Sequence, residues 1–126
     1  MRELFFAVAL ATGAAAAAPP SPASGAAMYR VYCASCHGAD GRGRGPAAAS
    51  KTPPADLTGL ARRNGGRFPS VRVFQAIEGG AGSPAHGSRD MPVWGNVFRR
   101  LGGADDARVK LRIRNLVRYL AAMQIR

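Results

Sequence analysis

Hydrophobic positions recur with a period near 3.6 residues in several segments of the chain. Met28, Val31 and Tyr32 follow this spacing after Ser24, a residue type that caps helices, which predicts a helix over residues 24–35. The last segment has the clearest pattern, with Asp105 and Asp106 in a first helical turn, where the helix dipole favours anions. Its apolar stripe consists of Val109, Ile113, Leu116, Leu120 and Met123.

Two shorter helices are predicted between these terminal ones. One spans residues 56–64 and ends before Gly65, with Leu57, Leu60 and Ala61 on one side. The other begins with Ser70 as N-cap and ends at Gly79, with an apolar stripe of Val73, Phe74 and Ile77.

Residues 38–54 and 79–95 are rich in glycine and proline and show no apolar period, so we expect loops there. No segment alternates with the period of two that is typical of strands, which predicts an all-α fold. Loops of this length in a compact domain normally serve a ligand or a function. The 16 glycines, 9 prolines and 7% aromatic content also leave little side-chain volume for a core in a chain of 126 residues.

The N-terminus predicts export. Arg2 is followed by the apolar run LFFAVALATGAAAAA, which has the length of a signal-peptide core and ends in small residues suited to cleavage. We therefore expect a signal peptide at 1–17, a short linker at 18–25 and one domain at 26–126. The run is too short and too rich in alanine for a membrane span, so we expect a soluble periplasmic product with no stable membrane insertion after cleavage; retention as an anchor is the alternative.

The formal net charge is +11, and arginine supplies nearly all of the positive charge. Such a charge favours an acidic protein, an anionic membrane surface or a nucleic acid as partner. Export makes nucleic acid an unsuitable partner, which leaves redox proteins with acidic docking surfaces as the expected partners. Arginine that merely keeps the protein soluble is the competing interpretation.

Both cysteines and one of the two histidines stand together in CASCH, residues 33–37. C-x-x-C-H is the attachment signature of c-type haem. On a helical turn, residues i and i+3 face the same side, so Cys33 and Cys36 can both form thioethers with one porphyrin while His37 reaches its iron. A disulfide between the cysteines is one alternative. A zinc site is another, although the chain offers only Cys33, Cys36, His37 and His86 as Cys or His ligands.

The opposite side of such an iron needs a second ligand or stays open. Of the four methionines, Met1 falls in the signal peptide, while Met28 and Met123 lie on predicted helices. Met91 stands in an irregular stretch before Pro92, where its side chain can be aimed freely, so it is the candidate. His86, a vacant site, and a plain core role for Met91 are the alternatives.

Two further residues are candidates for contact with the haem. The Pro46 carbonyl, just beyond the C-x-x-C-H, can accept a hydrogen bond from the second nitrogen of His37. Trp94 can cover part of the ring and direct its N–H at a propionate or a carbonyl, or it can simply pack in the core.

The order of CASCHG, GRGRGPAA, MPVWG and a final helix with VRYLAAM resembles a small bacterial class I cytochrome c over about residues 26–125. The resemblance implies the cytochrome c fold, with crossing N- and C-terminal helices and with Tyr29 or Tyr32 near Leu116, Tyr119 and Leu120. It also implies one haem c on Cys33 and Cys36, His37 and Met91 as axial ligands, and Pro46 as partner of the histidine. The chain departs from many relatives in using arginine where they use lysine and in its Gly-, Pro- and Arg-rich loop before Met91.

If protein ligands fill both axial positions, outer-sphere transfer of single electrons is the chemistry that remains. We therefore expect a monohaem electron carrier in the periplasm, not an enzyme. A haem protein with an open sixth site that acts in catalysis or gas binding is the alternative, and so is a haem subunit of a larger periplasmic oxidoreductase. A haem-free interaction module is a third.

Overall fold

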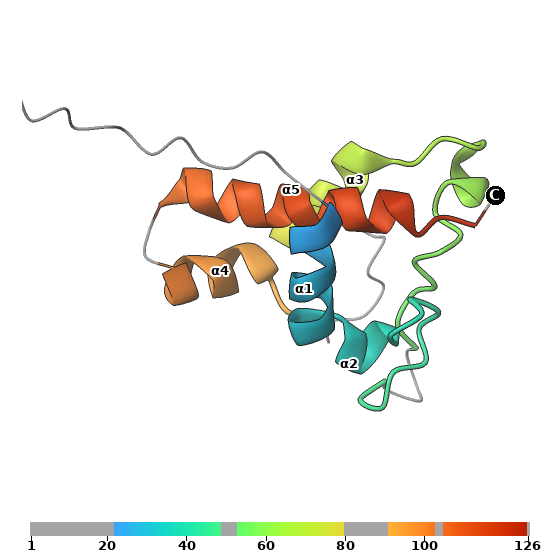
Figure 1. The fold of residues 1–126 in the computed structure, drawn as a ribbon, viewed down its shortest axis with the longest axis horizontal. Helices are drawn as coiled ribbons and strands as arrows, with labels where there is room; N and C mark the ends of the chain where they lie inside the picture. The colour runs from blue at the N-terminus through green and yellow to red at the C-terminus, as the bar shows by residue number, and fades with distance from the viewer. Residues whose placement is uncertain (1–21, 49–52, 80–90, 103–104, 126) are drawn as a thin grey trace, which may run out of the picture.

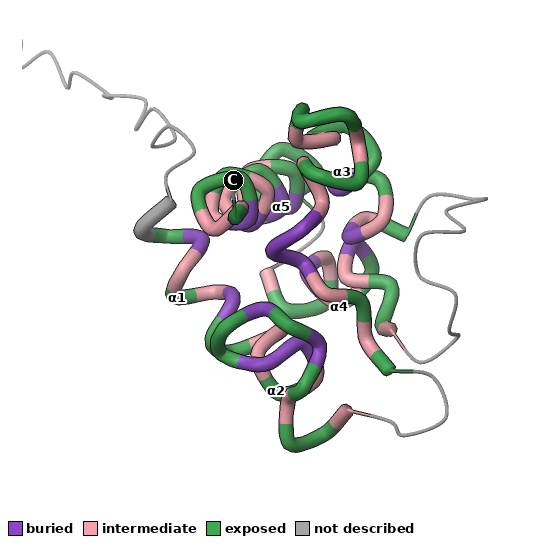
Figure 2. The backbone as a smooth tube through the Cα atoms, turned by 90° about the vertical axis from the view of Figure 1, so that its right-hand side faces the viewer, coloured by how far each residue is buried: buried purple, intermediate pink, exposed green. Residues whose placement is uncertain are grey.

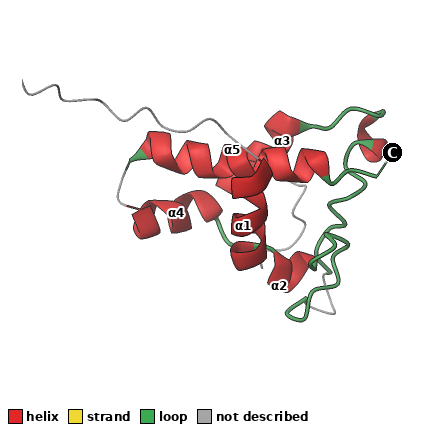
Figure 3. Cartoon of the chain, viewed as in Figure 1, coloured by secondary structure: helices red, strands yellow, loops and turns green. Residues whose placement is uncertain are grey.

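The computed structural model describes residues 22–48, 53–79, 91–102 and 105–125. The elements are α1 (Pro22–Tyr32), α2 (Ala34–His37), the 3-10 turn η1 (Arg62–Asn64), α3 (Ser70–Glu78), α4 (Trp94–Gly102) and α5 (Asp106–Ala122). These described parts contain no strand (Figure 3), which confirms the predicted all-α class. None of the described helices is both long enough and apolar enough to span a membrane.

Helix α1 crosses α5 (Figure 1), as expected for the N- and C-terminal helices of the predicted fold. Gly25 permits the close approach, because a Cβ there would overlap the Asn115 carbonyl oxygen and come within 2.7 Å of the Tyr119 Cβ. One turn further along α1, the ring of Tyr29 lies against Tyr119 with centroids 5.2 Å apart. Of the two tyrosines expected at the crossing, Tyr29 therefore occupies it.

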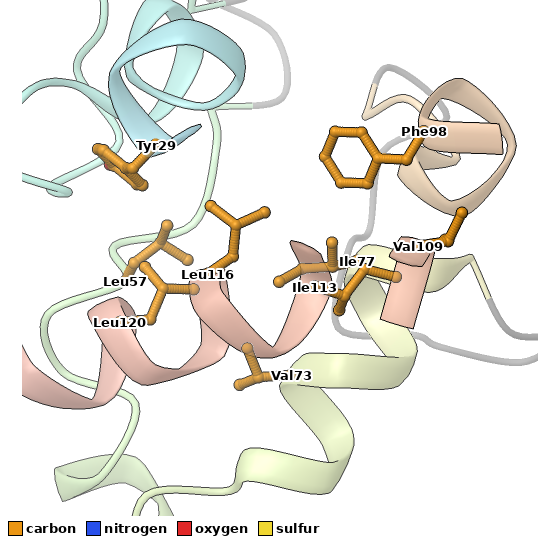
Figure 4. Packing of buried hydrophobic residues seen from close by; sticks show 9 residues of the cluster. All are labelled: Tyr29, Leu57, Val73, Ile77, Phe98, Val109, Ile113, Leu116 and Leu120. Carbon is orange, nitrogen blue, oxygen red and sulfur yellow. The ribbon is translucent and has the colours of Figure 1, made fainter. Parts of the chain in front are cut away.

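The core lies between α5 and the other helices. The predicted stripe of α5 is confirmed for Val109, Ile113, Leu116 and Leu120, which are all buried (Figure 2). Its fifth predicted member, Met123, is the C-cap of α5 and is only half-buried. Figure 4 shows Leu57, Leu116 and Leu120 near Tyr29 at one end of this row, and Phe98 above Val109 and Ile113 at the other. Burial of each such side chain stabilises the fold by about 1.5–3 kcal/mol, so this row supplies much of the driving force for folding.

Helix α4 was not predicted, and it begins inside the predicted loop 79–95. Its apolar positions Trp94, Phe98 and Leu101 follow helical spacing, and Phe98 is fully buried against α5. This apolar pattern is short and begins just after the Gly- and Pro-rich stretch that ends near Met91 and Pro92. The helix was therefore not recognised from the sequence. The described residues of the other predicted loop, 38–48 and 53–54, contain no helix.

Several predicted helix ends are corrected by the structure. Helix α1 begins at Pro22, so Ser24 lies inside it and residues 22–25 are helical instead of a linker. Proline suits a first turn because no intrahelical N–H bond is needed there. The predicted helix over 24–35 also stops at Tyr32, and α2 forms a separate turn after Cys33.

Ser70 is the first residue of α3, with Pro69 before it, so Ser70 is not the N-cap. Asp105 is the N-cap of α5 instead of a first-turn residue, and its side chain accepts hydrogen bonds from the Ala107 and Arg108 N–H groups. Helix α3 ends at Glu78 with Gly79 as its C-cap, so Gly79 stops the helix as predicted.

The predicted helix over residues 56–64 is wrong for most of its length. Only η1 is helical, followed by Gly65 as expected, and turns precede it. The Asp56 carboxylate accepts the Thr58 N–H at 2.8 Å and the Thr58 hydroxyl at 2.6 Å. Such local bonds compete with the helix for backbone donors.

The predicted signal peptide, residues 1–17, lies outside the described residues, and so does the part of the linker before Pro22. Signal cleavage stays a prediction. The predicted domain bounds of 26–126 likewise stay a prediction.

Gly25→Val should lower the free energy of unfolding by about 2 kcal/mol, because the added methyl groups force α1 away from α5. Urea unfolding of the haem-loaded protein, followed by far-UV circular dichroism, measures this loss. Ala27→Val is the matched control, since Ala27 is exposed on the same helix and loses only helix propensity, about 0.5 kcal/mol. Equal losses for the two variants would contradict a close crossing at Gly25.

Candidate functional site

A cavity of about 280 Å³ lies among α1, α2, α3, α5 and the segment from Ala55 to Asn64. Most of its wall is aliphatic: Leu57, Leu60, Val73, Ile77, Leu116 and Leu120. Cys33, His37 and Met91 line the same cavity, together with the Tyr29 side chain. Three of the six predicted site residues are thus brought to one apolar space.

Cys33 directly precedes the short helix α2, and Cys36 lies within it. The Cys33 carbonyl accepts the Cys36 N–H at 3.2 Å and the His37 N–H at 2.9 Å, which fixes the turn on the backbone alone. Both thiols are free and half-buried in this structure, so the predicted alternative of a disulfide is not formed here. Burial raises the pKa of the Cys33 thiol to about 12, with a smaller contribution from Cys36, so Cys33 is a neutral thiol.

His37 is buried, with 7% of its surface exposed. Its Nδ1 lies 3.0 Å from the Ala55 carbonyl oxygen. Because a carbonyl can only accept, Nδ1 carries the proton and Nε2 carries the lone pair. Burial lowers the pKa of His37 and outweighs the opposite effect of the Ala55 bond, so the ring is a neutral imidazole at neutral pH. A neutral imidazole with a free Nε2 is a metal ligand.

The prediction that the Pro46 carbonyl accepts this hydrogen bond is wrong, because Ala55 takes that role. The chain after His37 folds back on itself, and Gly43 makes this possible with φ of 78°. A Cβ at Gly43 would overlap the Pro54 carbonyl oxygen, next to Ala55. Pro46 is exposed in this loop. Pro46 was predicted because it is nearer to His37 along the chain. Nothing in the sequence reveals that the loop folds back at Ala55.

Met91 is half-buried and packs against the core beside the cavity. The other described methionines do not line it: Met28 packs against the core on α1, and Met123 packs over Gly41. His86, the predicted competitor, lies outside the described residues. Met91 is therefore the one described methionine that lines the same cavity as His37.

Trp94 packs with other aromatic rings instead of lining the cavity. Its ring centroid lies 5.5 Å from that of Tyr32 and 5.7 Å from that of Phe98. This arrangement is the core packing that was one of its two predicted roles.

Several site residues could not be identified from the sequence. Arg63, Asn64 and Arg72 line the cavity from η1 and α3, and no motif marks them. The Tyr29 hydroxyl donates to the Gly38 carbonyl at 2.8 Å and so ties α1 to the residue after His37. Burial raises the pKa of Tyr29, which therefore keeps its proton and remains a donor.

The zinc alternative finds no support in the described part of the chain, where no three Cys, His, Asp or Glu side chains gather as ion ligands. A tetrahedral structural zinc site requires four such ligands.

A protein-family model described as "Cytochrome C oxidase, cbb3-type, subunit III" matches residues 20–120. The chain belongs to this family of c-type cytochromes. No curated protein and no solved structure matches the chain. Family membership and the C-x-x-C-H spacing establish covalently bound haem c as the cofactor of this cytochrome, attached through Cys33 and Cys36.

The residues present fit this cofactor. The aliphatic wall suits a porphyrin, Cys33, His37 and Met91 line one cavity, and Cys36 follows Cys33 at i+3. Arg63 and Arg72 line the cavity and would offer positive charge to the carboxylates of a bound haem.

Replacing both Cys33 and Cys36 by alanine should abolish the covalent addition of haem when the protein is produced with haem maturation machinery. Intact-mass spectrometry of the purified protein measures the added porphyrin. Ser35→Ala is the matched control, since Ser35 is the exposed residue between the thiols, and it should retain the full added mass. Wild-type protein without added mass would refute attachment at this motif.

Proposed function

We propose that this cytochrome carries single electrons in the periplasm, with His37 and Met91 as the two axial ligands of its haem iron. The shared cavity carries the proposal, because His37, Cys33 of the attachment motif and Met91 all line it. Bound haem c supplies an iron that gains and loses one electron.

The chain's own residues set the conditions for that chemistry. The Ala55 carbonyl orients His37 and strengthens its Nε2 as a donor. The soft sulfur of Met91 favours the ferrous form, and the aliphatic wall excludes water and further penalises the ferric charge. We therefore expect a higher reduction potential than bis-histidine ligation gives.

A site closed on both faces by protein ligands leaves no position for a substrate. The cytochrome is then an electron carrier and not an enzyme by itself. Since His37 is held by a backbone bond and Met91 by core contacts, little has to rearrange when the charge changes.

Met91→Ala should abolish the sulfur-to-ferric-iron charge-transfer band of the oxidised protein and lower its reduction potential, because the thioether is lost. Absorption spectroscopy and a redox titration measure the two effects. Met28→Ala removes the same side chain from a half-buried position outside the cavity wall and should retain both properties. A band of unchanged intensity in Met91→Ala would refute this ligand assignment.

An open sixth site, which would serve catalysis or gas binding, is the rival function. Carbon monoxide distinguishes it, since tight and rapid binding to the reduced wild-type protein at neutral pH requires an accessible iron. The proposed ligation predicts that Met91→Ala binds carbon monoxide and the wild type does not.

A haem subunit of a larger oxidoreductase is a second candidate, favoured by the description of the matching family as an oxidase subunit. It is compatible with the same ligands and the same electron transfer. Stable co-purification with an oxidase from the native membranes would support it, and a monomeric protein that shuttles between partners would support the free carrier.

The partner of this cytochrome is proposed to present an acidic docking surface. The chain has a net charge of +11, so electrostatic attraction speeds encounter and leaves the complex weak and sensitive to salt. Electrons would leave where the attachment motif approaches the surface, and Arg44 stands there. Its side chain is 77% exposed, and the next residue, Gly45, donates its N–H to the Cys36 carbonyl at 3.0 Å.

Arg44→Glu should slow second-order reduction by an acidic redox protein about fivefold at low ionic strength, and added salt should remove the difference. Arg118→Glu makes the same change of charge at an exposed position of α5, a helix that does not contact α2 within the described residues, and should slow the reaction less. Stopped-flow absorption over a range of salt concentrations measures both. Rates that do not depend on salt would refute electrostatic docking.

A further inference from the structure

The C-terminal residues of the chain return to the segment that holds His37. Gln124 is half-buried, two residues beyond the end of α5. Its amide nitrogen donates to the Leu57 carbonyl at 2.7 Å and to the Leu120 carbonyl at 2.8 Å, and its amide oxygen accepts the Ala61 N–H at 2.9 Å. Both amide hydrogens are thus in use, and every partner is a backbone group.

The next residue extends the same attachment, because the Ile125 N–H donates to the Thr58 carbonyl at 2.9 Å. From Leu57 to Ala61 the chain forms a bend and turns instead of a regular helix. The C-terminal residues satisfy three backbone groups of this segment, at Leu57, Thr58 and Ala61. A backbone group without a partner would be costly where it is partly buried.

On its other side, this segment contacts the loop after His37, and Ala55, just before it in the chain, contacts His37 itself. The Leu57 N–H donates to the Gly41 carbonyl at 2.7 Å, and the Ala55 carbonyl accepts from His37. Leu57 and Leu60 also form part of the cavity wall. The segment is therefore held between the C-terminal residues and the loop after His37.

We propose that Gln124 is a positioning residue that holds the Ala55 carbonyl against His37 Nδ1 and thereby sets the donor strength of the proximal ligand. The inference rests on the proposed function, in which His37 is an axial ligand. Gln124 touches neither the imidazole nor the cavity and acts through the Leu57 and Ala61 backbone. Loss of the Gln124 hydrogen bonds would weaken the hydrogen bond from His37 Nδ1–H to the Ala55 carbonyl, make Nε2 a poorer donor to ferric iron and raise the reduction potential.

The test compares Gln124→Leu with Gln75→Leu in the haem-loaded protein. The substitution keeps most of the side-chain volume, adds no charge and removes all three bonds of Gln124. Gln75, the only other glutamine of the chain, is exposed on α3. We expect a raised potential and about tenfold faster solvent exchange of the His37 Nδ1 proton in Gln124→Leu, and wild-type values for both in Gln75→Leu. Redox titration and proton NMR of the reduced state are the measurements.

Gln124→Ala provides a second variant if leucine prevents folding, and it should shift both quantities in the same direction. A potential and an exchange rate equal to those of Gln75→Leu, with only a lower free energy of unfolding, would show that Gln124 is merely structural and overturn the inference. The methionine charge-transfer band separates this failure from that of the proposed function. A wild type that lacks the band refutes the ligation, whereas a wild type that has it, beside an unshifted Gln124→Leu, refutes the role of Gln124.

Discussion

The hydrogen bond between His37 Nδ1 and the Ala55 carbonyl is the contact on which the site depends. An imidazole ligates a metal through one nitrogen only if the other holds the proton, and a carbonyl at 3.0 Å enforces that state in a buried ring. The bond also constrains the path of the chain, because Ala55, 18 residues after His37, has to lie against the His37 ring. The glycine-rich composition of the loop between them follows from this constraint, most directly at Gly43.

The small core of the chain is explained by the same arrangement. The buried row on α5 is shared between two tasks: Val109 and Ile113 pack beside Phe98, while Leu116 and Leu120 also form the wall of the cavity. A chain with 16 glycines and 9 prolines has few side chains with which to fill its interior. Covalent haem adds apolar contact area to these walls, so attachment of the cofactor and stability of the helical body are coupled.

Periodicity and motif spacing allowed the terminal helices and the attachment residues to be predicted, because each depends on local sequence. The role of Met91 as a ligand stays a prediction. The errors concern contacts between distant segments. The acceptor of the His37 hydrogen bond is Ala55 and not Pro46, because a loop can fold back in many ways. Instead of the helix expected over 56–64, the chain forms turns that are hydrogen-bonded by Asp56 and Gln124. The short helix α4 escaped prediction since its apolar pattern spans only nine residues beside an irregular stretch.

The geometry of the attachment motif is carried almost entirely by main-chain groups. The carbonyls of Ser35, Cys36 and His37 accept N–H groups from Ala47, Gly45 and Gly43 at 2.8, 3.0 and 2.7 Å. These bonds do not depend on side-chain identity, except where a Cβ would collide, as at Gly45 with the Ser35 carbonyl. The loop side chains are therefore not needed to hold the motif, and the arginines of the loop, Arg42 and Arg44, are exposed. Haem attachment, set by the backbone, and the proposed partner recognition, set by exposed charge, can thus vary independently within one short segment.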